Sequence, residues 1–146
     1  MPDDWVPEIA LGVAGRIPRA YVPDDETRIN LYAEIDHVRD RASLDMLKLD
    51  IVDRFGALPR AAKVLLKLAE LRIRCFELGV QKLAAGPKGI AATFRTNDGA
   101  KAAERRPLPA DWRWSERKLV YPVETKGTVE RLNAAVTLLN RVDGAS

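Results

Sequence analysis

The clearest helical pattern in the chain lies in residues 43–79, which read SLDMLKLDIVDRFGALPRAAKVLLKLAELRIRCFELG. Ser43 is a suitable N-cap for a helix over residues 44–55, and Gly56 stands where a residue of positive φ commonly ends a helix. The apolar residues of this helix recur at helical spacing and form one stripe: Leu44, Leu47, Ile51 and Phe55.

Two further helices flank this one in the predicted order. A third helix is expected to start with Pro59 in its first turn and to end before Gly79, which allows the left-handed conformation common after a helix. Its apolar stripe is predicted to comprise Val64, Leu68, Leu71, Cys75 and Leu78. A first helix is predicted over residues 24–40, because acidic side chains at 24–26 favour a helix N-terminus.

The remaining pattern is that of short strands. A strand at residues 8–13 leads into an extended arm, a hairpin is predicted from strands 80–84 and 90–95, and 118–123 is a third strand of that sheet. Residues 96–114 are interpreted as a loop with one helical turn at 100–104, and 128–141 as a terminal helix. The prediction is an α+β fold: an N-terminal arm and three-helix half, then a small, mainly antiparallel sheet and a C-terminal helix. We expect one domain over residues 1–146, with a soft internal boundary near 96–114.

Composition excludes several classes of protein. The net charge of +3 arises from 24 basic and 21 acidic side chains, so neither sign dominates and no strong field for nucleic acid is expected. No apolar run approaches the roughly 20 residues of a membrane helix, and no signal peptide opens the chain. A cytoplasmic location without membrane contact is expected, and one cysteine permits no internal disulfide.

Reactive groups are too few for a catalytic site. His37 is expected on an exposed helix side, and Cys75 on an apolar stripe where a thiol packs as a small hydrophobe. Neither a zinc site nor a Walker loop can be drawn from this sequence, although binding of magnesium by carboxylates alone stays open. We therefore expect no enzyme, no catalytic residues, no cofactor and no metal.

The second helix carries the most informative surface. With the stripe of Leu44 and Ile51 turned inward, a helical step of about 100° places four other side chains on the opposite side: Met46, Leu49, Asp50 and Asp53. Carboxylates three residues apart repel modestly, so they indicate either a solvated surface or a basic partner. The apolar neighbours favour a partner, and this face is the predicted docking site.

A nucleic-acid-binding appendage is the alternative. Four basic residues share one side of the third helix and could contact phosphates: Arg60, Lys63, Lys67 and Arg74. Trp112 and Trp114 could stack on bases or could pack across a sheet edge.

The order and spacing of several short strings over residues 8–80 closely resemble the C-terminal domain of bacterial transcription-repair coupling factors. These strings are Glu8-Ile9 with Leu11, Ile17-Pro18, Tyr21-Val22-Pro23-Asp24, Arg28, Leu31-Tyr32, Asp53-Arg54-Phe55-Gly56, Leu58-Pro59 and Leu78-Gly79-Val80.

The resemblance implies a part of a larger ATP-driven DNA translocase that removes stalled RNA polymerase from damaged template and recruits excision repair. In that family the C-terminal domain folds back on an N-terminal region like the excinuclease B subunit and covers the surface that recruits excinuclease A. The parent protein would contact RNA polymerase, excinuclease A and DNA. Asp50 and Asp53 are the positions that the resemblance places on the docking side.

Overall fold

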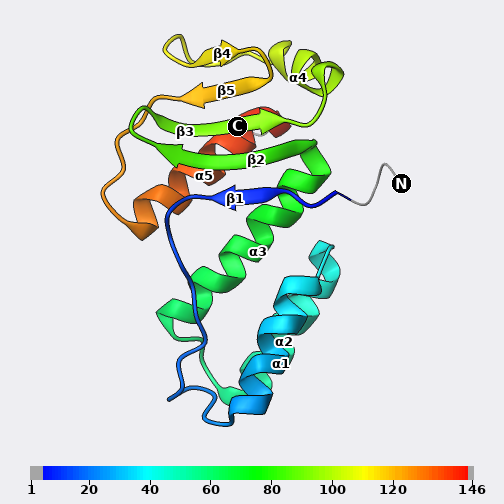
Figure 1. Cartoon of the computed structure of the whole chain (residues 1–146), viewed down its shortest axis with the longest axis vertical. Coiled ribbons are helices and arrows are strands. Elements are labelled where there is room, and N and C mark those ends of the chain that lie inside the picture. The colour runs from blue at the N-terminus through cyan, green and yellow to red at the C-terminus, as the bar shows by residue number, and fades with distance from the viewer. Residues whose placement is uncertain (1–4, 145–146) are drawn as a thin grey trace. The chain divides into compact units, whose positions relative to one another are not determined.

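The computed structural model describes residues 5–144, which form five helices and one five-stranded sheet (Figure 1). The predicted α+β class is confirmed. The chain divides into two compact units: a helical unit of Ala14–Ile73, and a sheet unit of Met1–Val13 with Arg74–Ser146. Residues 96–114, where composition suggested a soft boundary, lie wholly inside the sheet unit.

The helical unit contains α1 (Asp25–His37), α2 (Arg41–Phe55) and most of α3 (Arg60–Leu78). Its core draws on all three helices and on the arm that precedes them. Ile17 and Val22 of the arm are buried in it. The helical members of this core are Leu31, Ile35, Leu44, Ile51, Leu66, Ala69 and Ile73.

The predicted start of the second helix was wrong. The helix begins at Arg41, and Asp40 is its N-cap, because its carboxylate accepts a hydrogen bond from the Ser43 backbone nitrogen at 2.8 Å. The Ser43 hydroxyl donates to the same carboxylate at 2.9 Å. Both residue types favour the cap position, and the earlier one occupies it. Gly56 ends the helix with a φ of 92°.

The predicted stripe of α3 is only half of the helix's buried surface. Leu71 and Cys75 are fully buried as expected. A different row, on the opposite side of the helix, is buried as well: Ala62, Leu66, Ala69 and Ile73, of which the last three belong to the helical core. The helix begins at Arg60, so Pro59 stands just before its first turn and accepts hydrogen bonds from the backbone nitrogens of Ala62 and Lys63.

The sheet unit has the strand order β1-β2-β3-β5-β4. Its strands are β1 (Glu8–Ala10), β2 (Val80–Gly86), β3 (Gly89–Phe94), β4 (Arg113–Ser115) and β5 (Lys118–Tyr121). The predicted hairpin is β2–β3, and every pair is antiparallel except β1–β2, which is parallel. Cross-strand partners share one face of a sheet, so this register fixes which side chains lie together.

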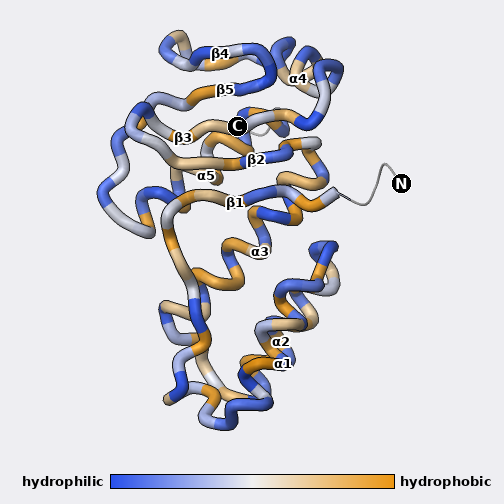
Figure 2. The backbone as a smooth tube through the Cα atoms, in the orientation of Figure 1, coloured by the Kyte–Doolittle hydropathy of each residue, from blue (hydrophilic) through white to orange (hydrophobic). Residues whose placement is uncertain are grey.

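One face of the sheet carries the core of this unit. α5 (Thr128–Asp143) packs against β3 and lies behind the strands in Figure 1. The row Ile9, Leu83, Ala92, Leu119 and Trp114 runs across the sheet by strand pairing. Leu83, Ala92 and Leu119 are buried, as are Leu138 and Leu139 of α5. In Figure 2 the hydrophobic colour accordingly marks parts of β3, β5 and α5.

The segment predicted as a loop with one helical turn at 100–104 contains a longer helix than predicted, and the start of a strand that was not predicted. α4 (Asn97–Glu104) is capped by Thr96, whose hydroxyl accepts a hydrogen bond from the Gly99 backbone nitrogen at 3.0 Å. Its buried side chains are only alanines, so its apolar stripe is weak in the sequence. β4 follows, and its three residues are a strand because they pair with β5.

Candidate docking surface

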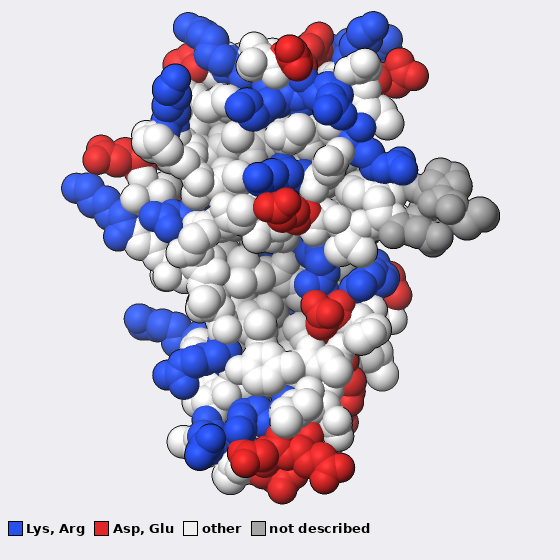
Figure 3. All heavy atoms as spheres, viewed as in Figure 1, with Lys and Arg blue, Asp and Glu red and all other residues white. Residues whose placement is uncertain are grey.

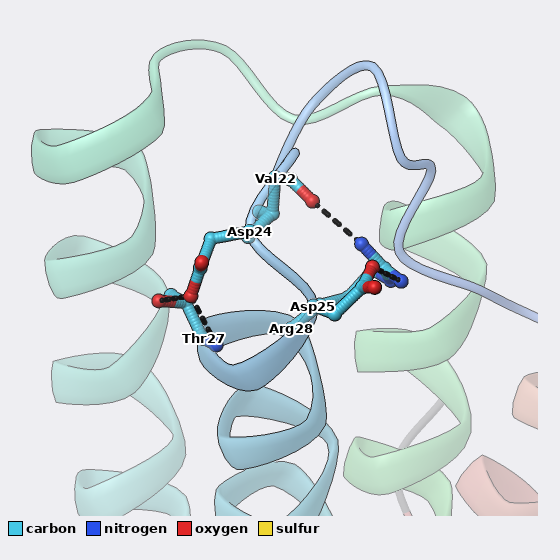
Figure 4. Close-up of polar contacts among 5 residues, drawn as sticks. All are labelled: Val22, Asp24, Asp25, Thr27 and Arg28. Carbon is cyan, nitrogen blue, oxygen red and sulfur yellow. Dashed lines mark hydrogen bonds and ion pairs between the residues drawn. The ribbon is translucent and has the colours of Figure 1, made fainter.

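The arm before α1 is held in place by residues of the quoted strings. Asp24 caps α1, since its carboxylate accepts from the Thr27 backbone nitrogen at 2.9 Å. Arg28 donates to the Val22 carbonyl oxygen at 3.0 Å and to the Asp25 carboxylate at 2.6 Å (Figure 4). The hydrogen bonds from Thr27 lower the pKa of Asp24, and Arg28 lowers the pKa of Asp25. These residues therefore have structural roles.

Two tyrosines tie the arm to the helices. The Tyr32 hydroxyl on α1 accepts a hydrogen bond from the Ile17 backbone nitrogen at 2.7 Å. The Tyr21 hydroxyl donates to the Gly56 carbonyl oxygen at 2.6 Å, and its ring lies 5.8 Å from that of Phe55. The contacts of Tyr21 with Gly56 and Phe55 hold the C-terminal end of α2 against the arm, which fixes the side of the helix that is exposed to solvent.

The outer face of α2 is as predicted in position. Met46 and Leu49 are 67% and 66% exposed, so two large apolar side chains lie side by side in solvent on this helix. Asp50 and Asp53 are exposed as well. Four side chains, two apolar and two acidic, thus share a surface that nothing in the described chain covers. We call Met46, Leu49, Asp50 and Asp53 the α2 face.

The two carboxylates of the α2 face differ in their surroundings. Asp50 accepts a hydrogen bond from Arg54 one turn later at 3.3 Å, and both side chains are about half exposed. An exposed pair of this kind contributes little to stability and can be exchanged for another partner. Within residues 5–144, Asp53 has no hydrogen-bond or ion-pair partner. Among the described residues, Asp50 is therefore paired with an arginine of the domain itself, whereas Asp53 is not.

Sequence reasoning missed two exposed apolar residues of the helical unit. Val52 on α2 is 41% exposed and Ile29 on α1 is 64% exposed. A helical wheel could have found Val52, because it lies to one side of the predicted stripe. The same wheel places Ile29 about 160° from buried Leu31 on α1, so it could have been found in the same way.

The four basic residues of α3 are not equally available. Arg60 and Lys63 are exposed. Lys67 donates to the Glu70 carboxylate at 3.0 Å, and Arg74 donates to the Asn140 side chain at 2.9 Å. Two of the four candidate phosphate contacts are thus engaged within the protein.

The two tryptophans take the packing alternative. Trp112 is buried and stacks on Tyr121 with ring centroids 4.4 Å apart, so its ring has no free surface for a base. Trp114 packs on Phe94 at 5.6 Å on the α5 side of the sheet. Base stacking by this pair is wrong for the observed structure.

The other sequence expectations are resolved residue by residue. Cys75 is buried as predicted, and burial raises the pKa of its thiol to about 12. His37 is exposed as predicted, with Nδ1 2.7 Å from the Ala33 carbonyl oxygen. Across residues 5–144, no three His, Cys, Asp or Glu side chains gather as metal ligands would. No helix in that range is both long and apolar enough to span a membrane.

Comparison with known proteins gives a consistent result. The TRCF domain family matches residues 11–104, which extends past the strings quoted above to the end of α4. Transcription-repair-coupling factors of Escherichia coli and Haemophilus influenzae are 35% and 39% identical over 60% and 56% of this chain. That of Rickettsia bellii is 32% identical over 64% of the chain. The chain spans only 7–8% of the length of these relatives.

A solved structure shares the fold. The crystal structure of the C-terminal domain of a transcription-repair coupling factor matches with a TM-score of 0.76 at 21% identity. The match covers 96% of this chain and 93% of that one. That structure shows the fold alone, and the family match over more than half of the residues shows that the chain belongs to the TRCF domain family.

Proposed function

We infer that this domain is a non-catalytic regulatory module of transcription-coupled DNA repair, which docks through its α2 face on the N-terminal excinuclease-B-like region of a coupling factor. Docking covers the surface that recruits excinuclease A, so the module is autoinhibitory. The observation that carries this inference is the exposure of Met46 and Leu49 beside the unpartnered Asp53.

The α2 face suits a releasable protein contact. Its apolar side chains supply area to bury, and its carboxylates select a cationic surface against other partners. A module joined to its target by a flexible linker meets it at an effective concentration near millimolar, so weak docking keeps the target mostly covered. A motor that changes conformation can then release it without overcoming a tight interface.

Charge reversal in a tethered protein tests the masking. The chain is joined by a flexible linker to the excinuclease-B-like region of a coupling factor, and excinuclease A binding to the fusion is measured. Asp50→Lys with Asp53→Lys should raise that affinity at least about tenfold, because like charges then meet across the contact. Met46→Ser with Leu49→Ser should act in the same direction.

The matched control reverses two carboxylates elsewhere on the surface, Asp111→Lys with Glu124→Lys, both exposed in the sheet unit. This control should leave excinuclease A binding unchanged. Equal affinities for the parent fusion and the α2-face variants would contradict the proposal. Circular dichroism of each variant separates loss of docking from loss of fold.

The nucleic-acid alternative now depends on Arg60 and Lys63, the exposed members of the basic set. Titration of the domain with duplex and single-stranded DNA at two salt concentrations tests it. Phosphate binding should weaken steeply with salt and with Arg60→Glu and Lys63→Glu. Absence of binding at low salt removes this alternative.

A further inference from the structure

The sheet has a second face, which no helix of its own unit covers within residues 5–144. Strand pairing places Glu8, Lys82, Thr93, Lys118 and Ser115 in one row across this face. The next row on the same face consists of Ala10, Ala84, Ala91, Val120 and Arg113. A shallow hollow of about 350 Å³ lies on this face, over β2, β3 and β5. We call this surface the open sheet face; it faces the viewer in Figure 1.

The open sheet face combines a floor of small side chains with a cationic rim. Ala84, Gly86 and Ala91 line the hollow, together with Lys82, Lys88 and Lys118. Lys82 forms an exposed pair with Glu8 at 3.5 Å. In the part of the chain that the structure describes, Lys88 and Lys118 have no hydrogen-bond or ion-pair partner. Figure 3 shows Lys and Arg side chains gathered over β4 and β5, above uncharged atoms.

This chemistry favours a protein over a nucleic acid as the occupant. The aromatic residues of the sheet, Phe94, Trp114 and Tyr121, lie on the other face by strand alternation, so no ring on the open sheet face can stack on a base. Alanine and valine side chains form neither hydrogen bonds nor ion pairs with phosphate. Small side chains instead allow a helix to approach the strands closely, and the lysines favour a helix that carries carboxylates.

The α2 face has the complementary chemistry and size. It presents exposed Met46 and Leu49 beside Asp50 and Asp53. The 15 residues of α2 extend over about 22 Å at 1.5 Å per residue. Five strands spaced about 4.8 Å apart make a sheet about 19 Å wide. One helix can therefore cross the whole open sheet face.

We propose that the open sheet face binds the α2 face of a second copy of this chain. Apolar Met46 and Leu49 lie on the alanine row, and the carboxylates of Asp50 and Asp53 pair with the lysines of the rim. The two contacting surfaces are different, so the association is heterologous. A single helix on a shallow sheet face buries less than the roughly 800 Å² per partner of a stable interface. Association is accordingly weak, in the range of about 100 µM or above, and sensitive to salt.

Sedimentation velocity of the 146-residue chain tests the proposal. In 50 mM NaCl the average sedimentation coefficient should rise between 20 and 500 µM, and this rise should vanish in 500 mM NaCl. Lys88→Glu with Lys118→Glu should abolish the rise, as should Asp50→Lys with Asp53→Lys. Lys101→Glu with Lys126→Glu changes the same charge at exposed positions outside the hollow and should preserve it.

Mixing the two inactive variants gives the sharpest result. In the mixture the unchanged helix of the sheet variant meets the unchanged sheet of the helix variant, and the two reversed surfaces are complementary as well. An equimolar mixture should therefore associate although neither variant does alone. Such restoration also shows that both variants are folded. A mixture that stays monomeric overturns the proposal, as does parent chain that stays monomeric at 500 µM in 50 mM NaCl.

Two further arms distinguish other occupants and the proposed function. If the chain binds duplex DNA through Lys88 and Lys118 and stays monomeric, the face is a nucleic-acid site and the self-association is wrong. Binding to the excinuclease-B-like region should survive Lys88→Glu with Lys118→Glu and be lost with Asp50→Lys with Asp53→Lys. Failure of that binding alone refutes the proposed function and leaves the self-association standing.

Discussion

Arg72 of α3 donates a hydrogen bond from Nη2 to the main-chain oxygen of Ile35, 2.9 Å away, at the C-terminal end of α1. The same nitrogen lies 3.4 Å from the carbonyl oxygens of Asp36 and Val38. One guanidinium thus satisfies carbonyls that a helix leaves without partners at its end. Burial lowers the pKa of Arg72, which nevertheless stays protonated at any ordinary pH.

Replacement of Arg72 by methionine should destabilise the helical unit. The apolar stem is retained, but the part-buried Ile35 carbonyl loses its charged donor, which costs about 1.5–3 kcal/mol, whereas the carbonyls of Asp36 and Val38 keep Arg39. Urea unfolding followed by circular dichroism measures the change. Arg60→Met, at an exposed position of the same helix, is the control and should cost under about 0.5 kcal/mol. Equal effects of the two substitutions would show that the α1 contact contributes nothing.

Acid should destabilise the fold through its helix caps. Hydrogen bonds from Thr27 lower the pKa of Asp24 below its ordinary 3.8, and those from Ser43 lower the pKa of Asp40. A lowered folded-state pKa means that stability is fully present above about pH 4 and is lost as pH falls through the folded value. Melting temperatures measured from pH 7 to pH 2 should show this loss.

Asparagine at both cap positions separates titration from capping. Asp24→Asn with Asp40→Asn keeps a side-chain oxygen that accepts the backbone hydrogen bond but removes the ionisable group. The decline in melting temperature below pH 4 should therefore be shallower than in the parent chain. An unchanged acid limb in this variant would exclude the caps as its origin.

The buried thiol should be inert in the folded protein. Cys75 is fully buried, and its pKa of about 12 leaves almost no thiolate at pH 8. Labelling with a chromogenic disulfide reagent at pH 8 should be slow in buffer and complete within the dead time in 6 M guanidinium chloride. Rapid labelling in buffer would mean that the third helix opens locally at low cost.

Gly89 is predicted to be the least replaceable residue of the hairpin. Its φ is +134°, and a Cβ built there lies 2.1 Å from the Tyr121 carbonyl oxygen. Gly89→Ala should therefore cost roughly 3 kcal/mol, from backbone strain and from displacement of β5. Gly86→Ala at the other side of the turn meets nothing within 4 Å and serves as the control. Thermal unfolding of both variants gives the comparison.

The order of elements and the α2 face were predictable because periodicity reports which side of an element is buried. The face of Met46 and Asp53 needed only the stripe through Leu44 and Ile51. By contrast, the cap of α2 could not be decided between Asp40 and Ser43, which are both good caps three residues apart. β4 is a strand because it pairs with β5, which is a tertiary interaction. Its three residues show too little alternation for a strand to be predicted from them.

The prediction was least complete for α3. This helix is apolar on two sides, so its sequence is compatible with more than one buried stripe. Reading the row of Leu71 and Cys75 alone left the row of Leu66 and Ile73 unassigned, although that second row completes the helical core. The open sheet face could not be predicted from the sequence either. Lys82, Lys118 and Ala91 lie on three different strands, and only the strand register brings them together.

The parallel pairing of Glu8 with Lys82 has a topological consequence. Parallel neighbours need a crossover, which in most proteins is a single helix. Here the crossover contains all of Ala14–Ile73, with its own hydrophobic core. The helical unit is thus an insertion between β1 and β2, which are neighbouring strands of the sheet. The entropic cost of closing a loop grows only with the logarithm of its length. Residues can therefore be added to or removed from the insertion while the strand register stays the same.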